Sequence, residues 1–242
     1  MTEQIYNSDA YKKELKSKII EINEDHVVLD KTIFFPGGGG QPNDLGSISS
    51  GETDRDITNV SWKNGKIAHF SDNLKDLSVG DVVLCKIDWD RRFKLMRTHT
   101  AMHILCGVIW RDYKASVTGG NMEPLKGRMD FEFPSLSAEL REEIEEKVNL
   151  EVRKDREISV DFLPREKAFQ IPDLIRTKVS LLPESLKIIR TINIHGLDLQ
   201  ADGGTHVSST SHVGYIKITG HESKGKINKR LRISVLSHLE SQ

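Results

Sequence analysis

The sequence contains only two cysteines, Cys85 and Cys106, in 242 residues. Two cysteines are too few for the disulfide framework that stabilises many secreted domains. The chain also lacks the run of about 18 apolar residues that a membrane-spanning helix needs. Its first twenty residues lack the apolar segment of a signal peptide. These absences predict a soluble protein of a reducing compartment, which we expect to be the cytoplasm, with no membrane partner.

An excess of charge of one sign is also absent. Lysine and arginine total 35 residues and aspartate and glutamate 36, so the formal net charge is −1. A chain this balanced has no long-range attraction for nucleic acid, and RNA binding would have to use a local basic patch. The sequence also lacks a Gly-x-Ser-x-Gly elbow. If the protein is a hydrolase, a metal ion would have to replace the serine or cysteine nucleophile.

The N-terminal third has the pattern of β-structure. Residues 12–90 contain short apolar runs separated by polar turns, and Asn64-Gly65 is a typical two-residue hairpin turn. We therefore predict a small antiparallel β-barrel domain over residues 1–90, which also carries a glycine-rich loop.

The pattern becomes helical after residue 88. A first helix is predicted from Trp89 to about Asp112, with Asp90 as its N-cap. A second helix is predicted over residues 137–154 because apolar side chains recur there every four residues. They are Leu140, Ile144, Val148 and Val152.

Strands are predicted after the second helix, around residues 158–162, 186–194, 215–219 and 231–236. Because helices and strands do not alternate strictly, residues 91–242 are predicted to form an α+β domain. This domain would have a mixed or antiparallel sheet and two main helices.

Two motifs indicate a metal site. His99 and His103 are four residues apart on the first predicted helix, which places both imidazoles on one face. Asp202 and His206 enclose Gly-Gly-Thr, which suits a tight loop. Together they provide a tetrahedral shell for zinc, or three ligands and an open position. The alternative is a pair of hydrogen-bonded core histidines beside an unrelated turn, but the presence of both motifs favours a metal.

Four consecutive glycines occupy positions 37–40 within FFPGGGGQPNDLG. A phosphate-binding P-loop is not favoured, because no Gly-Lys-Ser/Thr follows. The run instead predicts a loop whose bare backbone approaches a ligand, or a flexible hairpin tip.

Near the C-terminus, five basic residues fall between positions 224 and 232 in SKGKINKRLR. The run is typical of a solvated strand edge, or of a surface that contacts RNA phosphates and gains affinity by releasing counterions.

Taken in order, these motifs resemble the editing domain of alanyl-tRNA synthetase and its free-standing relatives, the AlaX proteins. The signature of that family is a helical His-x-x-x-His followed, much further along the chain, by Cys-Gly-Gly-Thr-His-Val. Here the two parts read His99-Thr-Ala-Met-His103 and Asp202-Gly-Gly-Thr-His206-Val207. The glycine-rich segment and the basic strand resemble two further elements of the family. The departure is Asp202, which stands where the family usually has cysteine.

The resemblance implies an enzyme that hydrolyses mischarged alanine tRNA in trans. The partner would be tRNA(Ala) carrying serine or glycine, and the cofactor one zinc ion per chain. Its implied ligands are His99, His103, Asp202 and His206. Because a carboxylate is a harder ligand than a thiolate, manganese or cobalt would also be tolerated. With three ligands the zinc would activate a water, and with four it would orient the substrate.

The resemblance also implies residues that contact the substrate. Thr100 is the candidate catalytic residue, because its hydroxyl would bond a seryl hydroxyl that alanine lacks. Its alternative is a helix residue that bonds its own backbone. The implied substrate- and tRNA-binding residues are Gly38, Gly39, Gly40, Gln41, Gly203, Gly204, Thr205, Lys224, Lys226, Lys229 and Arg230.

Three other functions compete with this interpretation. A metal-dependent hydrolase of a small ester or amide would have no use for the basic run. A non-catalytic tRNA-binding relative with a degenerate metal site would have no reason to keep three histidines in register. A threonyl-tRNA synthetase type of editing module shares the histidine motif, but the upstream glycine-rich segment favours the alanine family.

Overall fold

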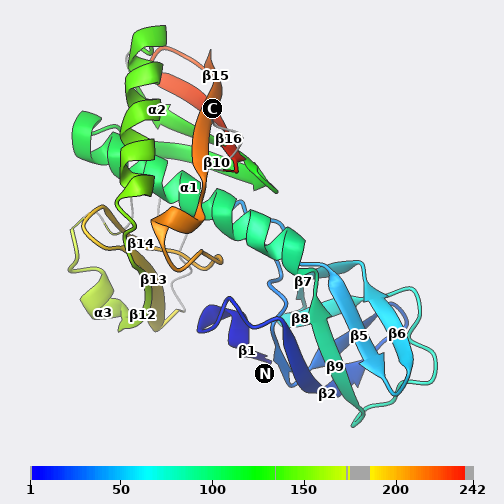
Figure 1. Ribbon diagram of the computed structural model, residues 1–242. Helices are drawn as coiled ribbons and strands as arrows, with labels where there is room; N and C mark the ends of the chain where they lie inside the picture. The colour runs from blue at the N-terminus through cyan, green and yellow to red at the C-terminus, as the bar shows by residue number, and fades with distance from the viewer. Residues whose placement is uncertain (1, 134, 173, 175–185, 238–242) are drawn as a thin grey trace. The chain divides into compact units, whose positions relative to one another are not determined.

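The computed structural model describes residues 2–133, 135–172, 174 and 186–237 (Figure 1). It divides into two compact units, Met1–Lys94 and Leu95–Gln242. Helices and antiparallel sheets occur together, so the predicted α+β class is confirmed. None of the helices in the described residues is long and apolar enough to cross a lipid bilayer.

The first unit is built on one antiparallel sheet of seven strands, in the order β6-β5-β9-β2-β3-β8-β7. These strands are β2 (Glu14–Ile22), β3 (His26–Leu29), β5 (Gly46–Ser50), β6 (Thr53–Ile57), β7 (Asn59–Lys63), β8 (Lys66–Phe70) and β9 (Val82–Ile87). Two short strands, β1 (Glu3–Gln4) and β4 (Lys31–Thr32), pair in parallel beside the 3-10 turn η1 (Ile5–Asn7). Among the described residues the edge strands β6 and β7 do not pair with each other, so the predicted closed barrel is not confirmed.

The predicted hairpin turn is confirmed between β7 and β8. Asn64 and Gly65 both have positive φ angles, 51° and 74°, as a type I′ turn requires. Alternate side chains of the sheet then point into one apolar core, which contains Ile19, Leu29, Phe34, Ile48 and Val83 among others.

Helix α1 (Trp89–Tyr113) begins at the end of the first unit and continues in the second. Its N-cap is Asp88, whose Oδ1 accepts a hydrogen bond from the backbone N–H of Arg91 at 3.0 Å. The prediction of Asp90 as the cap was wrong, because Asp90 lies inside the first turn and pairs with Lys94. Both aspartates suit a cap, and only the backbone path from β9 chooses between them.

Helix α2 (Ala138–Arg153) is confirmed with its predicted apolar face. Ser137 caps it by accepting a hydrogen bond from the backbone N–H of Leu140 at 3.1 Å. The helix packs against strand β15 (Tyr215–Ser223), where the Asn149 side chain bonds both backbone groups of Ile216. These bonds fix the height of the helix along the strand.

The second unit contains two antiparallel sheets. The first has the order β10-β11-β16-β15 and comprises β10 (Val117–Glu123), β11 (Lys126–Glu132), β15 and β16 (Asn228–Leu236). The second comprises β12 (Ile158–Pro164), β13 (Ile188–Ile194) and β14 (Asp198–Ala201). Two short helical segments, α3 (Arg165–Ala168) and η2 (Thr210–His212), complete the unit.

The four predicted strands of this unit are present, whereas β10, β11 and β14 had not been predicted. Glycines at positions 119, 120 and 127 lower the strand propensity of β10 and β11. At position 127 the glycine has a packing reason, because a Cβ there would lie 3.0 Å from the Met102 sulfur of α1. Gly127 therefore lowers the strand propensity of β11 in the sequence and, in the structure, allows α1 to pack closely against β11.

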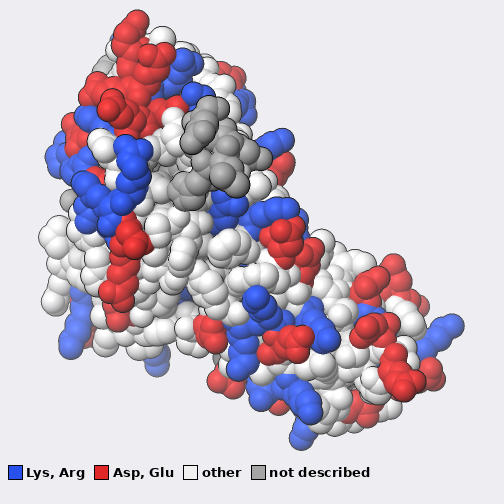
Figure 2. All heavy atoms as spheres, viewed as in Figure 1, with Lys and Arg blue, Asp and Glu red and all other residues white. Residues whose placement is uncertain are grey.

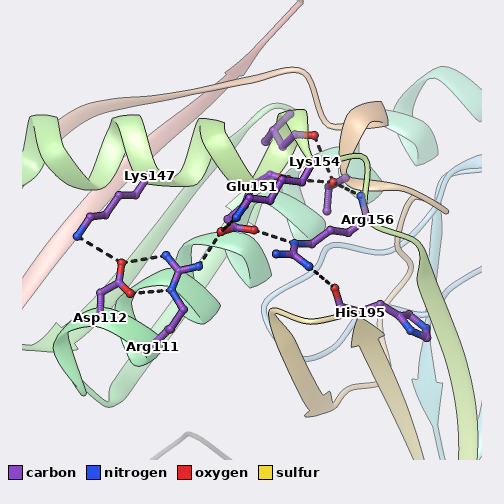
Figure 3. Close-up of polar contacts among 9 residues, drawn as sticks. Arg111, Asp112, Lys147, Glu151, Lys154, Arg156 and His195 are labelled. Carbon is purple, nitrogen blue, oxygen red and sulfur yellow. Dashed lines mark hydrogen bonds and ion pairs between the residues drawn. The ribbon is translucent and has the colours of Figure 1, made fainter.

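A buried carboxylate joins the elements of the second unit (Figure 3). Glu151, at the end of α2, pairs with Arg111 of α1 at 2.6 Å and with Arg156 at 2.7 Å. Arg156 in turn donates to the backbone carbonyl of His195 in the β13–β14 turn. The network therefore holds the C-terminal half of α1 beside the β13–β14 hairpin.

Candidate metal centre

Helix α1 and the segment after β14 bring the four predicted metal ligands together. His99 and His103 lie one turn apart on α1, and Asp202 and His206 lie in the loop that follows β14. The hairpin can approach α1 closely because position 107 is glycine: a Cβ there would lie 2.9 Å from the Leu197 side chain. One ligand atom from each residue lies within 4.8 Å of the other three.

The imidazoles and the carboxylate face one another at short range. Asp202 Oδ2 lies 3.1 Å from His206 Nε2, and its Oδ1 lies 3.5 Å from His99 Nε2. The rings of His99 and His206 stack with centroids 4.2 Å apart, and His103 meets both edge-on. Three imidazole nitrogens and a carboxylate that converge in this way form the donor set of a zinc site.

Burial keeps two of these imidazoles neutral. It lowers the pKa of His99 to about 4, with a smaller lowering from neighbouring His103. Burial and the nearby His99 likewise hold the pKa of His206 well below its usual range. A neutral imidazole offers a lone pair without first losing a proton, so the folded chain presents these nitrogens ready for a cation.

The Asp202 carboxylate is fixed in its ionised form. Burial alone would raise its pKa, but the adjacent His99 and a hydrogen bond from His206 hold the pKa well below its usual range. The backbone N–H of Gly204 also donates to Oδ2 at 2.7 Å, and Arg190 donates to the Asp202 carbonyl at 2.9 Å. Asp202 therefore stands at the position of the family's cysteine as a charged and oriented carboxylate that could bind a metal ion.

Gly203 and Gly204 do not adopt positive φ angles, so the loop does not need glycine for left-handed backbone geometry. Gly203 is exposed and a Cβ there would meet nothing within 4 Å, whereas Gly204 is buried. Thr205 is also buried, and its backbone carbonyl accepts a hydrogen bond from the His99 imidazole. Gly204 and Thr205 thus hold the ligands, and their predicted contact with substrate stays a prediction.

Thr100 lies directly behind His206. Its hydroxyl is 3.2 Å from His206 Nδ1 and accepts a hydrogen bond from the backbone N–H of Val207 at 3.2 Å. The side chain is fully buried. Its contact with a substrate hydroxyl stays a prediction, and the structure adds a contact with a metal ligand that sequence reasoning had not considered.

The glycine-rich loop belongs to the first unit. Gly37, Gly38, Gly39 and Gly40 all have positive φ angles, between 59° and 134°. The loop closes through two backbone hydrogen bonds of 3.0 Å between Gly38 and Gln41. No helix begins at these described residues, in agreement with the rejection of a P-loop. Its predicted contact with substrate stays a prediction.

The basic run forms the hairpin between β15 and β16, and most of its cations are engaged within the protein. Arg230 makes two 2.7 Å hydrogen bonds to Asp130, and Lys224 pairs with Glu222 at 2.7 Å. Lys229 is buried and donates to the backbone carbonyls of Gly225 and Lys226. These contacts favour a structural role for the three residues, while Lys226 makes no ion pair within the described residues.

A basic groove on the same sheet had been missed by sequence reasoning. Lys126, Arg128 and Arg232, with one acidic residue, Glu123, line a groove of about 420 Å³ over β10, β11, β15 and β16. Arg128 and Arg232 are directly opposite each other across β11 and β16, although they are far apart in the sequence. Only strand register could have revealed that Arg128 and Arg232 are neighbours.

Acidic and basic side chains lie interspersed on the face of the molecule that Figure 2 shows.

Two family models match the chain. The model described as "Threonyl and Alanyl tRNA synthetase second additional domain" matches residues 189–232, which include Asp202 and His206. The model described as "tRNA synthetases class II (A)" matches residues 2–91. The chain is thus similar, in both units, to modules of aminoacyl-tRNA synthetases.

Individual relatives narrow this class. An alanyl-tRNA editing protein AlaX-M of Saccharolobus solfataricus is 38% identical over 237 residues, 97% of this chain and 99% of that protein. The AlaX-M protein of Methanosarcina barkeri is 32% identical over 98% of this chain and 100% of its own length. An alanine–tRNA ligase of Ignicoccus hospitalis is 37% identical over 90% of this chain, which is 24% of the ligase. The chain belongs to the AlaX-M family of alanyl-tRNA editing proteins, and the resemblance read from its motifs is confirmed.

Proposed function

We propose that this protein hydrolyses, in trans, the ester that joins serine or glycine to a mischarged tRNA(Ala). The observation that carries the proposal is the buried convergence of His99, His103, Asp202 and His206 in a chain of the AlaX-M family. An aminoacyl ester is already activated, so modest polarisation of its carbonyl suffices for attack by water.

The four side chains would hold one zinc ion, with manganese or cobalt as replacements that the Asp202 oxygen would accept. When bound, such a cation supplies Lewis-acid polarisation of the ester carbonyl. The chain keeps His99 and His206 neutral and Asp202 ionised, so at these positions a cation is bound without displacement of protons. Asp202 has a half-buried side chain while the histidines are buried, which makes it the ligand nearest to solvent.

We propose that Thr100 contributes to the choice of amino acid. When His206 offers Nε2 to a cation, the hydrogen of the neutral ring lies on Nδ1, and it would be donated to the Thr100 hydroxyl, which also accepts from Val207. The hydroxyl hydrogen is left to be donated, and a seryl hydroxyl would be its acceptor. Thr100→Ser retains this donor and Thr100→Val removes it, so the pair separates selectivity from packing.

We also propose that the basic groove receives the phosphates of the acceptor end of the tRNA. Like charges directly opposite each other on neighbouring strands destabilise a sheet. Arg128 lies 3.7 Å from Asp130, but that carboxylate is already held at 2.7 Å by Arg230. Arg232 pairs with the partly exposed Glu222 at 3.0 Å, which reduces the repulsion only in part, and a phosphate between Arg128 and Arg232 would bind both guanidinium groups. Contacts of this kind would bind any tRNA sequence.

The first test is deacylation by the purified protein of tRNA(Ala) charged with serine, glycine or alanine. Serine or glycine should be released and alanine retained, and chelation should abolish the reaction until zinc is restored. Equal hydrolysis of small esters, without dependence on tRNA, would favour the alternative of a metal-dependent esterase. Tight tRNA binding without hydrolysis, in protein loaded with zinc, would favour the non-catalytic alternative.

The second test separates the groove from the basic run. Replacing Arg128 by glutamine removes one phosphate contact, so it should weaken tRNA binding and reduce the slope of log K against log salt by about 0.7–0.9. The matched control is Lys224→Gln, because Lys224 is paired with Glu222 and should contribute little. A larger effect of the control than of Arg128→Gln would assign the tRNA surface to the basic run instead.

A further inference from the structure

A second buried aspartate lies beside the metal centre, outside the predicted ligand set. Asp198, the first residue of β14, places its carboxylate Oδ2 3.0 Å from His103 Nδ1, and its side chain is fully buried. Sequence reasoning missed it because it lies four residues before the Asp202 motif, in an ordinary strand pattern, Asp-Leu-Gln-Ala. A buried carboxylate costs free energy unless its position has a compensating partner.

Neighbouring side chains fix the position of this carboxylate. Gln200, two residues along β14, donates from Nε2 to Asp198 Oδ2 at 2.7 Å. The same amide lies 3.3 Å from the sulfur of Cys106, which follows His103 by one helical turn on α1. Asp198, Gln200 and Cys106 thus connect β14 to the helix that carries two of the four ligands.

The carboxylate can only accept hydrogen bonds when ionised, so it selects the state of the imidazole that it faces. His103 must carry a hydrogen on Nδ1 to bond Asp198, and in the neutral ring this leaves the Nε2 lone pair for the metal. We propose that Asp198 is a positioning residue of the metal centre, which holds His103 in the Nδ1–H tautomer and orients its ring toward the ion. The inference rests on the proposed metal site and adds a residue outside the two motifs that supply the four ligands.

His103 differs in this respect from the other two histidines. His206 Nδ1 faces the neutral hydroxyl of Thr100, and His99 bonds the backbone carbonyl of Thr205. Only His103 has a carboxylate as its outer partner among the described contacts. A carboxylate partner makes the ring a stronger ligand than a hydroxyl or a carbonyl does, so the effect should be largest at His103.

The test is zinc affinity of the whole protein, measured by competition with a chromogenic chelator. Asp198→Asn preserves the shape of the side chain, removes its charge and can place an NH₂ group against Nδ1. We expect zinc affinity to fall by about 10- to 100-fold, the usual effect of removing an outer partner of a metal-bound histidine. Zinc affinity equal to that of the unaltered protein would overturn the proposal.

The matched control is Glu145→Gln, since Glu145 is also a largely buried carboxylate of the second unit, but it accepts from Tyr215, Lys217 and the backbone N–H of Ile218, away from the ligands. This variant should lose stability against denaturant and keep its zinc affinity. If it loses as much zinc affinity as Asp198→Asn, the effect is one of general packing and the proposal fails.

A second measurement does not depend on metal. Nitrogen-15 NMR of the metal-free protein reports which ring nitrogen of His103 carries hydrogen. We expect Nδ1–H in the unaltered protein and a shift toward Nε2–H in Asp198→Asn. The same tautomer in both proteins would overturn the role of Asp198, whereas absence of zinc binding in the unaltered protein would contradict the metal site itself.

Discussion

Both units bury charged side chains away from water, but the two buried sites have opposite balances of hydrogen-bond donors and acceptors. In the first unit, Arg92 and Asp44 are both fully buried. In the second, the three histidines and Asp202 converge on one another within 4.8 Å. Burial alone therefore does not distinguish a structural site from one that binds a ligand.

In the first unit, the hydrogen-bonding groups of Arg92 and Asp44 find partners in each other and in the surrounding backbone. Arg92 donates to both oxygens of Asp44 and to the backbone carbonyls of Ala10 and Ile33. Asp44 in addition accepts from the backbone N–H of Phe35 at 2.6 Å. Every strong acceptor thus faces a donor, and the pair closes the base of the glycine-rich loop, which lies between Phe35 and Asp44.

The cluster in the second unit has too few donors. When the three rings carry their hydrogens outward, toward Thr100, Thr205 and Asp198, the inner ring nitrogens and the two Asp202 oxygens all face the same small space as acceptors. Acceptors that converge in this way repel one another unless a cation lies among them. An excess of acceptors, rather than burial, is therefore the feature that would favour a metal ion at this site.

The largest expected effect comes from removing a ligand. His206→Ala should lower kcat/KM for mischarged tRNA by about 10⁴-fold, or about 5 kcal/mol, because Lewis-acid polarisation contributes several kcal/mol to the transition state. Zinc content, measured on the same sample, should fall in parallel. The matched control is His212→Ala, an exposed histidine six residues later, which should change neither quantity. Unchanged turnover in His206→Ala would remove the metal from the mechanism.

The next largest effect is a loss of stability when the buried pair of Arg92 and Asp44 is broken. Arg92→Met leaves Asp44 buried without its cation and should lower the free energy of unfolding of the first unit by about 3–5 kcal/mol. The double variant Arg92→Met, Asp44→Leu should recover much of this loss, because an apolar pair needs no partner charges. Denaturant unfolding measures both. Equal losses in the single and double variants would show that Asp44 does not depend on Arg92 for its burial.

Lowering the pH should destabilise the first unit through His69, a buried imidazole that lies outside the candidate metal centre. Burial lowers the pKa of His69 to about 4 from 6.5, since its ring is enclosed beside Thr32. The unfolded chain takes up the proton first, so this contribution is complete above pH 6.5 and is lost as the pH falls toward 4. The loss should reach about 3 kcal/mol.

The measurement is the free energy of unfolding between about pH 7 and pH 4, compared with His69→Gln, which cannot ionise. The variant should have a flatter dependence in this range. Parallel curves for the two proteins would mean that His69 is not held neutral.

The smallest effect tests Asp202 itself. Asp202→Cys restores the ligand usual in the family and replaces a hard oxygen by a soft sulfur. Zinc affinity relative to manganese should rise by about tenfold, or about 1.4 kcal/mol, as measured by competition between the two ions. Identical selectivity would exclude Asp202 from direct contact with the metal.

Local patterns predicted much of the fold because they depend on near neighbours in the chain. The 3.6-residue period identified both long helices, and Asn64-Gly65 identified a hairpin. Strands β10 and β11 escaped prediction because their glycines serve the packing of α1, a contact that is invisible in a local window. The N-cap was predicted at Asp90 and lies at Asp88 for a similar reason, because the backbone path from β9 into the helix is not visible in a local window.

The metal centre shows the same division. His99 and His103 were predictable as a pair, since helical geometry alone places them on one face. Their meeting with Asp202 and His206 rested on a family resemblance, and the structure supplies the contact. Arg128 and Arg232 became neighbours only through strand register, and Asp198 became relevant only when β14 packed on α1.

The sequence by itself determined which side chains could bind a metal, their spacing along each segment and the helix or loop that carries them. These properties follow from the order of the residues and from the 3.6-residue period of a helix. Only the tertiary structure decided which polar groups share a buried space and in which direction their hydrogens point. The reason is physical: the cost of burying a lone pair or a charge depends on the partners that packing brings from distant segments. That packing gives Arg92 and Asp44 all their partners within the protein, and it gathers His99, His103, Asp202 and His206 into a group that could hold a cation.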